Sequence, residues 1–379
     1  MSQTCIPEKT RLRLWVAAGG RCEYRGCNEP LYRDHLTLAQ MNRSYIAHII
    51  ADKPGGPRGD PELSSALAKS FSNLMLLCDT CHRRIDEEEV EAHPVALLAE
   101  YKQEHELRIE TVTGIDYRRK TYIVAYAAKV GERDGDVTHD QARIAVLRNG
   151  WYPATNSIIA LNTTEAAQGD DSPAFWQTEC TNIDAFVQGR LTGHGPDGRP
   201  MEHLSVFALA PMPLLVYFGR KLGDIVPVEI YQRHRDTEDW VWRDAEEPDF
   251  RYITERVIPG APGIQDVVLE LSLSDALDPA CITAAAPAGA AWYKFTIERP
   301  HRDFLKTPEQ WRLFGEEYGQ LLSQIRADLG ANCTIHLFPA VPVSIALQIG
   351  RMSLPKSDAS MAVYDFNRQC GGWMKALDL

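Results

Sequence analysis

The alternation of apolar and polar positions after residue 120 predicts strands and helices in turn. Short runs rich in β-branched and aromatic residues indicate strands at Thr121–Ala128, Ser205–Leu209, Val226–Tyr231, Val267–Leu273, Trp292–Ile297, Thr334–Phe338 and Met361–Phe366. Pro308–Leu329 has the period of an amphipathic helix, and Gly330 suits its end. Strands that alternate with helices favour an α/β fold with a largely parallel sheet.

The N-terminal third has a different pattern and ends in a single helix. Apolar residues recur at helical spacing over 94–112, where Pro94 suits the first turn and Gly114 suits the stop. We therefore expect a first domain over 1–113, a hinge over 114–120 and a second domain over 121–379.

A weak internal repeat divides the second domain. Segments 207–220 and 338–351 carry the same four residues, Phe, Pro, Gly and Arg, at an offset of 131. Trp240 and Trp373 follow at nearly the same offset. We expect two related α/β halves with a pseudo-twofold groove between them, and ligands of open α/β sheets sit at the carboxyl ends of the strands.

Composition and charge narrow the classes of protein. The chain is 44% hydrophobic and 24% charged, as in a soluble globular protein. No apolar run approaches the ~20 residues of a membrane span, and the N-terminus lacks the apolar core of a signal peptide, so we expect a cytoplasmic protein without a membrane partner. A net charge of −12 argues against a general nucleic-acid binder. The charge is segregated, however, with +4 over 1–85, −7 over 86–113 and −9 over 114–379.

Four of the nine cysteines form two closely spaced pairs. Cys22 and Cys27 make one pair, and Cys78 and Cys81 make the other. Two such pairs in a reducing compartment predict a tetrahedral Zn²⁺ site, because each turn points two thiolates at one ion. Disulfides are the competing explanation and fit a reducing compartment poorly. Four thiolates leave no open position, so this zinc is expected to be structural.

Two histidines and an asparagine accompany the second cysteine pair. His48 lies in the β-like run 43–50, Asn73 precedes the pair and His82 follows it directly. In this order they resemble the HNH nuclease family, whose ββα-metal core carries a His on its first strand, an Asn before the helix and a ligand just after a Cys-x-x-Cys. The resemblance covers about residues 10–112, which we call the finger. A Cys₄ zinc site fits the variant of the family in which a structural zinc ion holds the finger together.

The resemblance implies a metal-dependent phosphodiester hydrolase with His48, Asn73 and His82 as its catalytic residues. His48 is expected to take a proton from the attacking water, and Asn73 to fix the His48 loop by hydrogen bonding. Ala47 precedes the base where the family commonly has a metal ligand. We therefore expect the catalytic Mg²⁺, or a similar divalent ion, on His82 and Asp86, which share a helix face. Candidate DNA-phosphate contacts are Arg25, Arg43, Lys53, Arg58, Arg83 and Arg84.

The second domain resembles a different family. Residues 334–342, the Gly-Arg at 350–351 and the strand at 362–367 resemble the SAVED domain, which looks like two fused CARF-type, Rossmann-like halves. The resemblance spans about residues 117–379 and implies a cyclic oligonucleotide ligand. Stacking aromatics and phosphate-facing residues would form its site, with the candidates Lys129, Trp151, Tyr152, Ser272, Ser274, Phe338, Pro339, Arg351, Lys356, Tyr364 and Asn367.

An HNH finger followed by a SAVED domain is similar to the effector nucleases of bacterial CBASS anti-phage systems. That family implies a cyclic di- or trinucleotide activator from a partner synthase, a ligand-driven homo-oligomer and double-stranded DNA as the substrate. Two alternatives remain open: an HNH restriction-type endonuclease whose C-terminal domain reads DNA, and a nucleotide-sensing scaffold with an inactive finger. The acidic second domain speaks against the first, and Ala47 keeps the second open.

Overall fold

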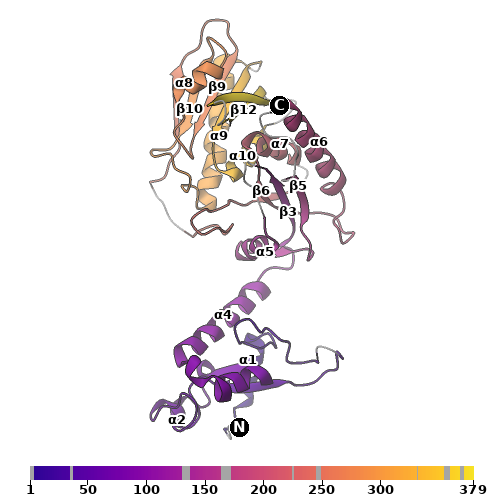
Figure 1. Ribbon diagram of the computed structural model, residues 1–379, viewed down its shortest axis with the longest axis vertical. Coiled ribbons are helices and arrows are strands. Elements are labelled where there is room, and N and C mark those ends of the chain that lie inside the picture. Colours follow the sequence, from indigo (N-terminus) through magenta and orange to yellow (C-terminus); the bar gives the residue numbers. More distant parts are fainter. Residues whose placement is uncertain are drawn as a thin grey trace. The chain divides into compact units, whose positions relative to one another are not determined.

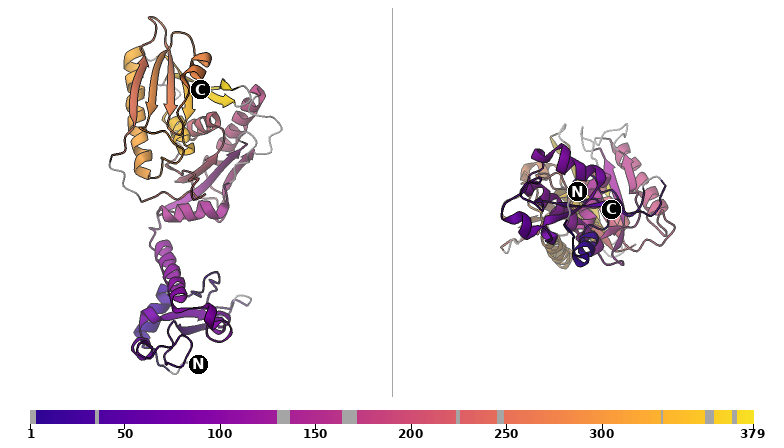
Figure 2. Two further views of the ribbon diagram at one scale, coloured as in Figure 1. Left: turned by 60° about the vertical axis from the view of Figure 1, so that its left-hand side comes forward. Right: turned by 90° about the horizontal axis from the view of Figure 1, so that it is seen from below.

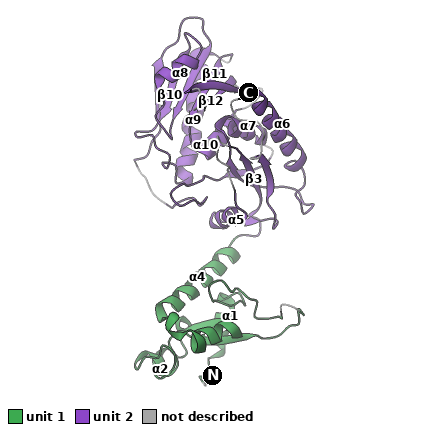
Figure 3. Ribbon diagram, viewed as in Figure 1, with its two compact units in different colours: residues 1–115 green, residues 116–379 purple. Residues whose placement is uncertain are grey.

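The structure, a computed structural model, has two compact units, residues 1–115 and 116–379 (Figure 1 and Figure 3). It describes residues 4–34, 37–129, 137–163, 172–223, 226–244, 249–330, 332–353, 359–367 and 371–379. The division falls inside the segment 114–120 that is expected to be a hinge. Among the helices that the structure describes, none combines the length and hydropathy of a membrane span.

The first unit is built around a short antiparallel hairpin. β1 (Ser44–His48) pairs with β2 (Leu74–Cys78), which is buried along its whole length. The remaining elements are α1 (Glu8–Ala17), α2 (Leu63–Leu67), η1 (Phe71–Asn73), α3 (Asp79–Arg83), η2 (Arg84–Glu88), η3 (Val90–Ala92) and α4 (Val95–Thr113). Leu14 of α1, Ile85 of η2 and Leu98 of α4 pack in one core with β2. The hairpin and the helix after it therefore follow a ββα order.

The second unit contains two sheets of mainly parallel strands. The first has the order β4-β3-β6-β7, with β5 also paired to β3, and the second has the order β13-β12-β11-β9-β10-β8. Their bounds are β3 (Lys120–Ala128), β4 (Tyr152–Pro153), β5 (Ile159–Thr163), β6 (Leu204–Leu209), β7 (Val228–Ile230), β8 (Ile253–Ile258), β9 (Asp266–Ser272), β10 (Ala291–Thr296), β11 (Thr334–Ala340), β12 (Ser360–Asn367) and β13 (Gly372–Asp378). Only the edge strands β8 and β13 pair antiparallel among these described ladders, which confirms the predicted α/β fold.

Helices cover both faces of the second sheet (Figure 2). The helices of the unit are α5 (His139–Arg148), α6 (Pro173–Arg190), α7 (Met212–Leu222), α8 (Pro279–Ala285), α9 (Pro308–Leu329) and α10 (Val343–Met352). Successive residues of a strand point to opposite faces. Leu269 of β9 accordingly packs in the core that contains Phe314 of α9, while Val268 packs with Ile282 of α8.

The two halves of the second unit repeat one architecture, which confirms the internal repeat. The strand order β5-β3-β6-β7 of the first half recurs as β10-β9-β11-β12 in the second. Each half also has a triad of aromatic rings, Phe207–Tyr231–Trp240 in the first and Phe338–Tyr364–Trp373 in the second. In both triads the Phe and Tyr rings stack with 4.4 Å between centroids, and the Trp ring meets the Phe ring edge-on at 5.3 and 5.4 Å.

The halves are joined where α7 packs on α10, and two glycines allow the close approach. A Cβ atom on Gly219 would lie 2.0 Å from the carbonyl oxygen of Leu347, and a Cβ atom on Gly350 would lie 1.9 Å from that of Val216. The two contacts are equivalent under the offset of 131, so a pseudo-twofold axis relates the helices. Because no side chain fits between the backbones, both positions require glycine.

The sequence predicts the buried elements better than the edges. α9 has its predicted bounds, and α4 begins and ends one residue later than predicted. The edge strand β8 was not predicted, because five of its six residues are exposed and its pattern lacks a buried face. α6 was also missed, although it supplies Phe175 and Ile183 to the main core.

Candidate functional site

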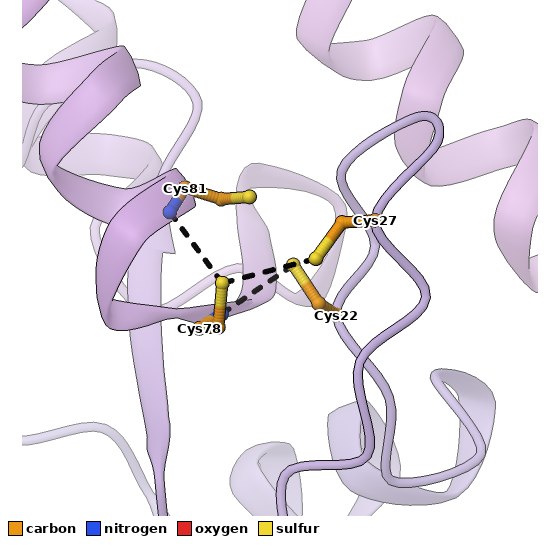
Figure 4. Close-up of side chains that lie close together, drawn as sticks. All are labelled: Cys22, Cys27, Cys78 and Cys81. Carbon is orange, nitrogen blue, oxygen red and sulfur yellow. Dashed lines mark hydrogen bonds between the residues drawn. The ribbon is translucent and has the colours of Figure 1, made fainter. Parts of the chain in front are cut away.

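Four cysteine side chains meet between the loop after α1 and the start of α3 (Figure 4). Cys22 and Cys27 lie in that loop, Cys78 ends β2, and Cys81 lies in α3. The four sulfur atoms lie within 4.8 Å of one another, with 3.9 Å between Sγ of Cys27 and Sγ of Cys78. The structure thus brings together the set that the spacing of the two pairs predicts.

The surroundings of these sulfur atoms suit a soft divalent cation. The backbone N–H groups of Cys78 and Cys81 donate to the Sγ atoms of Cys22 and Cys78, at 3.4 and 3.5 Å. Hydrogen bonding to Cys78 and burial raise the pKa of the Cys22 thiol, whereas hydrogen bonds from Cys22 and Cys81 lower the pKa of Cys78. Deprotonation of one cysteine therefore makes deprotonation of its neighbour less favourable. A bound divalent cation offsets the repulsion between the negatively charged sulfur atoms. The donor set fits a closed, structural Zn²⁺ site.

His48 is held in one tautomer. It ends β1, is 7% exposed, and its Nε2 lies 2.9 Å from the carbonyl oxygen of Ala68. Because a carbonyl oxygen can only accept a hydrogen bond, Nε2 carries the proton and Nδ1 holds the free lone pair. The neutral imidazole can therefore accept a proton at Nδ1.

Asn73 fixes the backbone that follows His48. Its Oδ1 accepts a hydrogen bond from the N–H of Ile50 at 2.8 Å, and its Nδ2 donates to the carbonyl of Ile50 at 2.8 Å. Its own carbonyl accepts from the N–H of Ile49 at 2.9 Å. Asn73 is 3% exposed, so its carboxamide is used within the protein and acts on the His48 loop.

His82 and Asp86 lie one helical turn apart, with 3.3 Å between Nε2 and Oδ2. The ring of Tyr45 on β1 stacks on the His82 imidazole at 4.9 Å between centroids, a contact that the sequence analysis missed. Arg58 donates to the other carboxylate oxygen, Oδ1, at 2.5 Å. The remaining pair of donors, one imidazole nitrogen and one carboxylate oxygen, fits a divalent ion that keeps water in its shell.

Arg58 does not occupy the surface position expected of a phosphate contact. Its side chain is 6% exposed and forms an ion pair with Asp86. The loop that carries it turns the guanidinium into the interior of the first unit. The prediction that it contacts DNA is therefore wrong.

The other candidate phosphate contacts are at least partly exposed, and most have acidic neighbours. Arg25 pairs with Glu100 and Glu104 of α4 at 2.8 and 2.7 Å. The remaining arginine pairs are Arg43 with Glu29 at 2.7 Å, Arg83 with Asp79 at 3.0 Å and Arg84 with Glu89 at 3.7 Å. The Lys53 side chain is exposed and forms no ion pair with the described residues. Exposed ion pairs stabilise a fold only weakly because water screens them, so a phosphate can compete for these arginines.

Five of the candidate ligand residues lie at the carboxyl ends of parallel strands. Lys129 follows β3, Ser272 ends β9, Ser274 lies two residues beyond, Pro339 is near the end of β11 and Asn367 ends β12. Ser272 and Pro339 are buried. Lys129, Ser274 and Asn367 are partly exposed and remain the best placed for a ligand.

Two aromatic candidates belong to the core. Phe338 and Tyr364 are the stacked rings of the second triad and are 0% and 6% exposed. The phenol oxygen of Tyr364 also lies 3.0 Å from Nδ1 of His336. Neither ring offers a free face to a nucleobase, so the prediction that they form a stacking platform is wrong.

The remaining candidates do not gather at the carboxyl edge. Tyr152 pairs with Lys120 at the amino end of β3, which places Trp151 and Tyr152 at the opposite edge of the first sheet, and their assignment is corrected. Arg351 lies in the last turn of α10, where its Nε donates to the carbonyl of Gly223 at 3.4 Å. Lys356 lies outside the described residues.

A pocket that the sequence analysis did not anticipate lies beside Asn367. It is lined by Pro173, Trp176, Asp365, Asn367, Met374, Lys375 and Ala376. These residues come from α6, β12 and β13. Of these three elements, the sequence predicted only β12, whose carboxyl end borders the pocket. The other two elements were not predicted, so their side chains could not have been found by pattern.

Comparison with known proteins identifies the family of the second unit. The profile of the SAVED family, the SMODS-associated and fused to various effectors sensor domain, matches residues 184–379. The match begins within α6 and includes the whole second sheet, but it leaves out β3, β4 and β5 of the first sheet. No curated protein sequence matches the chain.

Solved structures of Cap4 SAVED/CARF-domain containing receptors are similar to the chain. The Acinetobacter baumannii receptor with the cyclic trinucleotide 3'3'3'-cAAA is 12% identical with a TM-score of 0.42, over 74% of this chain and 56% of the receptor. The same receptor with 2'3'3'-cAAA is 10% identical with a TM-score of 0.41, over 84% and 59%. The Moraxella osloensis receptor is 11% identical with a TM-score of 0.39, over 75% and 57%. This chain thus spans less than two thirds of the length of each receptor.

The profile match covers all of the second half of the doubled α/β architecture and part of the first half. The six strands of the second sheet, the helix pair α7 and α10 and the two aromatic triads all lie within the matched residues. The match extends over more than half of the chain. The chain therefore belongs to the SAVED family, with its sensor domain in the second unit.

Proposed function

We propose that the chain is a metal-dependent DNA endonuclease that a cyclic oligonucleotide activates, as part of bacterial anti-phage defence of the CBASS type. Residues 1–115 cleave double-stranded DNA, and residues 116–379 bind the nucleotide. The observation that carries the nuclease assignment is His48, whose Nδ1 is free to accept a proton because Nε2 is fixed on Ala68.

Membership of the SAVED family supports the sensor role, and the pseudo-twofold arrangement suits the ligand. A cyclic oligonucleotide repeats one chemical unit around a ring, and two related halves present two related sets of strand ends to it. Lys129, Ser274 and Asn367 supply a cation, a hydroxyl and an amide at those ends. The cyclic trinucleotides named for the Acinetobacter receptor are the first compounds to test.

The proposed hydrolysis begins with proton transfer to His48. Nδ1 takes a proton from a water molecule, whose oxygen attacks phosphorus in line. As the new P–O bond forms, the bond to the leaving oxygen breaks, and that oxygen takes a proton from solvent. The products are a phosphomonoester and a hydroxyl, and His48 returns its proton to solvent. The Ala68 carbonyl stabilises the imidazolium, because hydrogen bonds from a charged donor are stronger.

His82 and Asp86 are the residues that would hold a divalent ion. When bound, such an ion neutralises the negative charge that develops on the phosphate and the leaving oxygen. Tyr45 orients the His82 ring by stacking. The four-cysteine site has no part in the chemistry, since it connects the loop after α1 to α3, the helix that carries His82.

The charge pattern supports activation by assembly. Residues 1–85 carry a net charge of +4 and the rest of the chain is acidic, so one finger should bind DNA weakly. Several fingers in a homo-oligomer raise the effective concentration of cations along one DNA molecule. A nucleotide drives that assembly only if it binds the assembled form more tightly than the monomer.

The test is plasmid cleavage by the purified full chain. The assay includes or omits Mg²⁺ or Mn²⁺ and a panel of cyclic di- and trinucleotides, and we expect cleavage only when both are present. His48→Ala should lower the rate about 10²–10⁴-fold, the usual contribution of a general base, and should keep the zinc content. His194→Ala removes an exposed histidine of the second unit and should cleave at the wild-type rate.

The other outcomes separate the alternatives. Cleavage without any nucleotide favours a restriction-type endonuclease, and absence of cleavage under every condition favours a nucleotide-sensing scaffold. Full activity of His48→Ala would remove His48 from the mechanism.

A further inference from the structure

A buried cation lies between the two parts of the proposed nuclease site. Arg58 has a side chain that is only 6% exposed, although it sits in a loop rich in glycine and proline. A buried arginine is costly unless each of its donors is paired. The partners of this guanidinium therefore indicate what the residue does.

The loop at 53–59 is folded to turn Arg58 inward. The N–H of Gly56 donates to the carbonyl of Lys53 at 3.0 Å, and the N–H of Gly59 donates to the carbonyl of Gly56 at 2.9 Å. Arg58 has a φ of +56°, a left-handed conformation that non-glycine residues rarely adopt. A Cβ atom on Gly59 would lie 2.3 Å from the carbonyl oxygen of Pro54, so the chain passes too close for a side chain there.

On one side the guanidinium contacts the backbone of the proposed base. Nε donates to the carbonyl of Ile49 at 2.8 Å, and Nη2 lies 3.3 Å from the carbonyl of His48. Asn73 already pairs with both backbone groups of Ile50. The side chains of Arg58 and Asn73 thus fix three consecutive residues, the last residue of β1 and the two that follow it.

On the other side the guanidinium contacts the helix that carries the proposed metal ligands. Nη1 donates to the carbonyl of Ile85 at 2.6 Å, and Nη2 donates to Oδ1 of Asp86 at 2.5 Å. Oδ2 of the same carboxylate faces Nε2 of His82. A continuous set of contacts therefore leads from the His48 carbonyl through Arg58 and Asp86 to His82.

We propose that Arg58 is a positioning residue that sets the distance and orientation of His48 relative to His82 and Asp86. This inference rests on the proposed nuclease function and deepens it. Arg58 touches neither water nor substrate in this role. It holds the strand with the base and the helix with the metal ligands in one rigid arrangement, and it keeps one Asp86 oxygen occupied so that only Oδ2 faces His82.

Lysine cannot replace arginine in this position. The planar guanidinium presents five N–H donors in a fixed fork, and four acceptors on two elements use that fork here. An ammonium group keeps the charge for Asp86 but cannot reach both elements in the same geometry. Arg58→Lys therefore removes the positioning and preserves the ion-pair charge.

The kinetic test compares Arg58→Lys with Arg11→Lys in the full chain. Arg11 is exposed on α1 and serves as the matched control, which should cleave plasmid at the wild-type rate. A misplacement of about 1 Å typically costs on the order of 100-fold, so we expect kcat of Arg58→Lys to fall about 100-fold. KM for DNA should stay within about twofold, because Arg58 makes no contact with substrate. A raised KM with unchanged kcat would identify a phosphate contact and overturn the inference.

A second measurement does not depend on cleavage. In the wild-type chain labelled with ¹⁵N at arginine and histidine, NMR should detect a slowly exchanging Nε–H for Arg58 and a fast one for Arg11. The His48 ring should show the Nε2–H tautomer, and Arg58→Lys should shift or broaden its signals. Rapid exchange at Arg58, or an unchanged His48 ring in Arg58→Lys, would overturn the inference.

The two measurements separate two kinds of failure. If the wild-type chain never cleaves DNA, the proposed function fails, while the NMR signals still decide whether Arg58 holds the His48 strand. If the wild-type chain cleaves and Arg58→Lys keeps full kcat, the function stands and the role of Arg58 is refuted. If Arg58→Lys does not fold, the Nε–H exchange of the wild-type chain alone decides.

Discussion

The packing of α7 on α10 makes a prediction that opposes the usual effect of the substitution. Replacing a helical glycine by alanine ordinarily stabilises a protein by about 1 kcal/mol, because glycine loses more backbone entropy on folding. Gly350→Ala should do the reverse. The added Cβ would lie 1.9 Å from the carbonyl oxygen of Val216, and real Cβ contacts essentially never fall below 3.0 Å.

The size of the effect follows from the geometry of this contact. The two helices must separate by about 1.1 Å, the difference between those distances. Val216 and Leu347 are both fully buried in the core shared by the two halves, so the separation loosens packing on both sides. Overpacking of a core costs about 1–3 kcal/mol and occasionally more, and the neighbour here is rigid backbone. We expect Gly350→Ala to lower the free energy of unfolding by about 3 kcal/mol.

The assay is urea unfolding of the full chain, followed by tryptophan fluorescence. Gly319→Ala is the matched control, because Gly319 also lies inside a helix and its Cβ would meet only the flexible Met352 Cε at 3.5 Å. That variant should be unchanged or stabilised by up to about 1 kcal/mol. Gly219→Ala should behave like Gly350→Ala, and the double variant should lose less than the sum, since both methyl groups open the same contact. Equal stability of Gly350→Ala and Gly319→Ala would show that the helices do not approach this closely in solution.

Two further predictions concern the zinc site and the pH dependence of stability. Cys78→Ser should lose bound zinc, measured by metal analysis, and should yield less soluble protein. Cys281→Ser, a substitution outside the cluster, should keep both the zinc and the yield. Full zinc content in Cys78→Ser would contradict the four-cysteine site. Burial, followed by the charge of Arg119, lowers the pKa of His203 from 6.5 to about 4. As the pH falls, the His203 side chain is therefore protonated in the unfolded chain before it is protonated in the folded chain. The stability that depends on neutral His203 should be complete above about pH 6.5 and fall by about 3 kcal/mol as the pH drops through 4. His203→Gln should reduce that fall in urea unfolding between pH 7 and pH 4, and an identical pH profile would refute the assignment.

Much of the second unit follows from local patterns. The central strands are buried, so their apolar runs stand out against the rest of the chain, and α9 carries an unbroken amphipathic period between a capping box at Thr307 and Gly330. The repeat at an offset of 131 is equally visible, because the same backbone contact between α7 and α10 requires glycine at 219 and 350. The edge strand β8 could not be predicted in this way, since five of its six residues are exposed. The helix α6 was missed although its buried residues recur at helical spacing.

The sequence predicts the four-cysteine cluster for a chemical reason. Each pair of cysteines is closely spaced, so both sulfur atoms of a pair can reach one ion, and four thiolates form a donor set that fits a closed tetrahedral Zn²⁺ site. The order of His48, Asn73 and His82 along the chain likewise predicts that they belong to one ββα element.

What only the tertiary structure decides is the direction in which a side chain points. Arg58 looks like a surface cation in a turn, yet the path of its loop brings the guanidinium onto carbonyl groups of β1 and η2. Phe338 and Tyr364 look like stacking platforms, but they pack on each other inside the second half. Trp151 directly precedes β4, and the pairing register places it at the amino end of the first sheet. Sequence spacing fixes which residues are neighbours along the chain, whereas exposure depends on segments far apart in sequence that only the folded chain brings together.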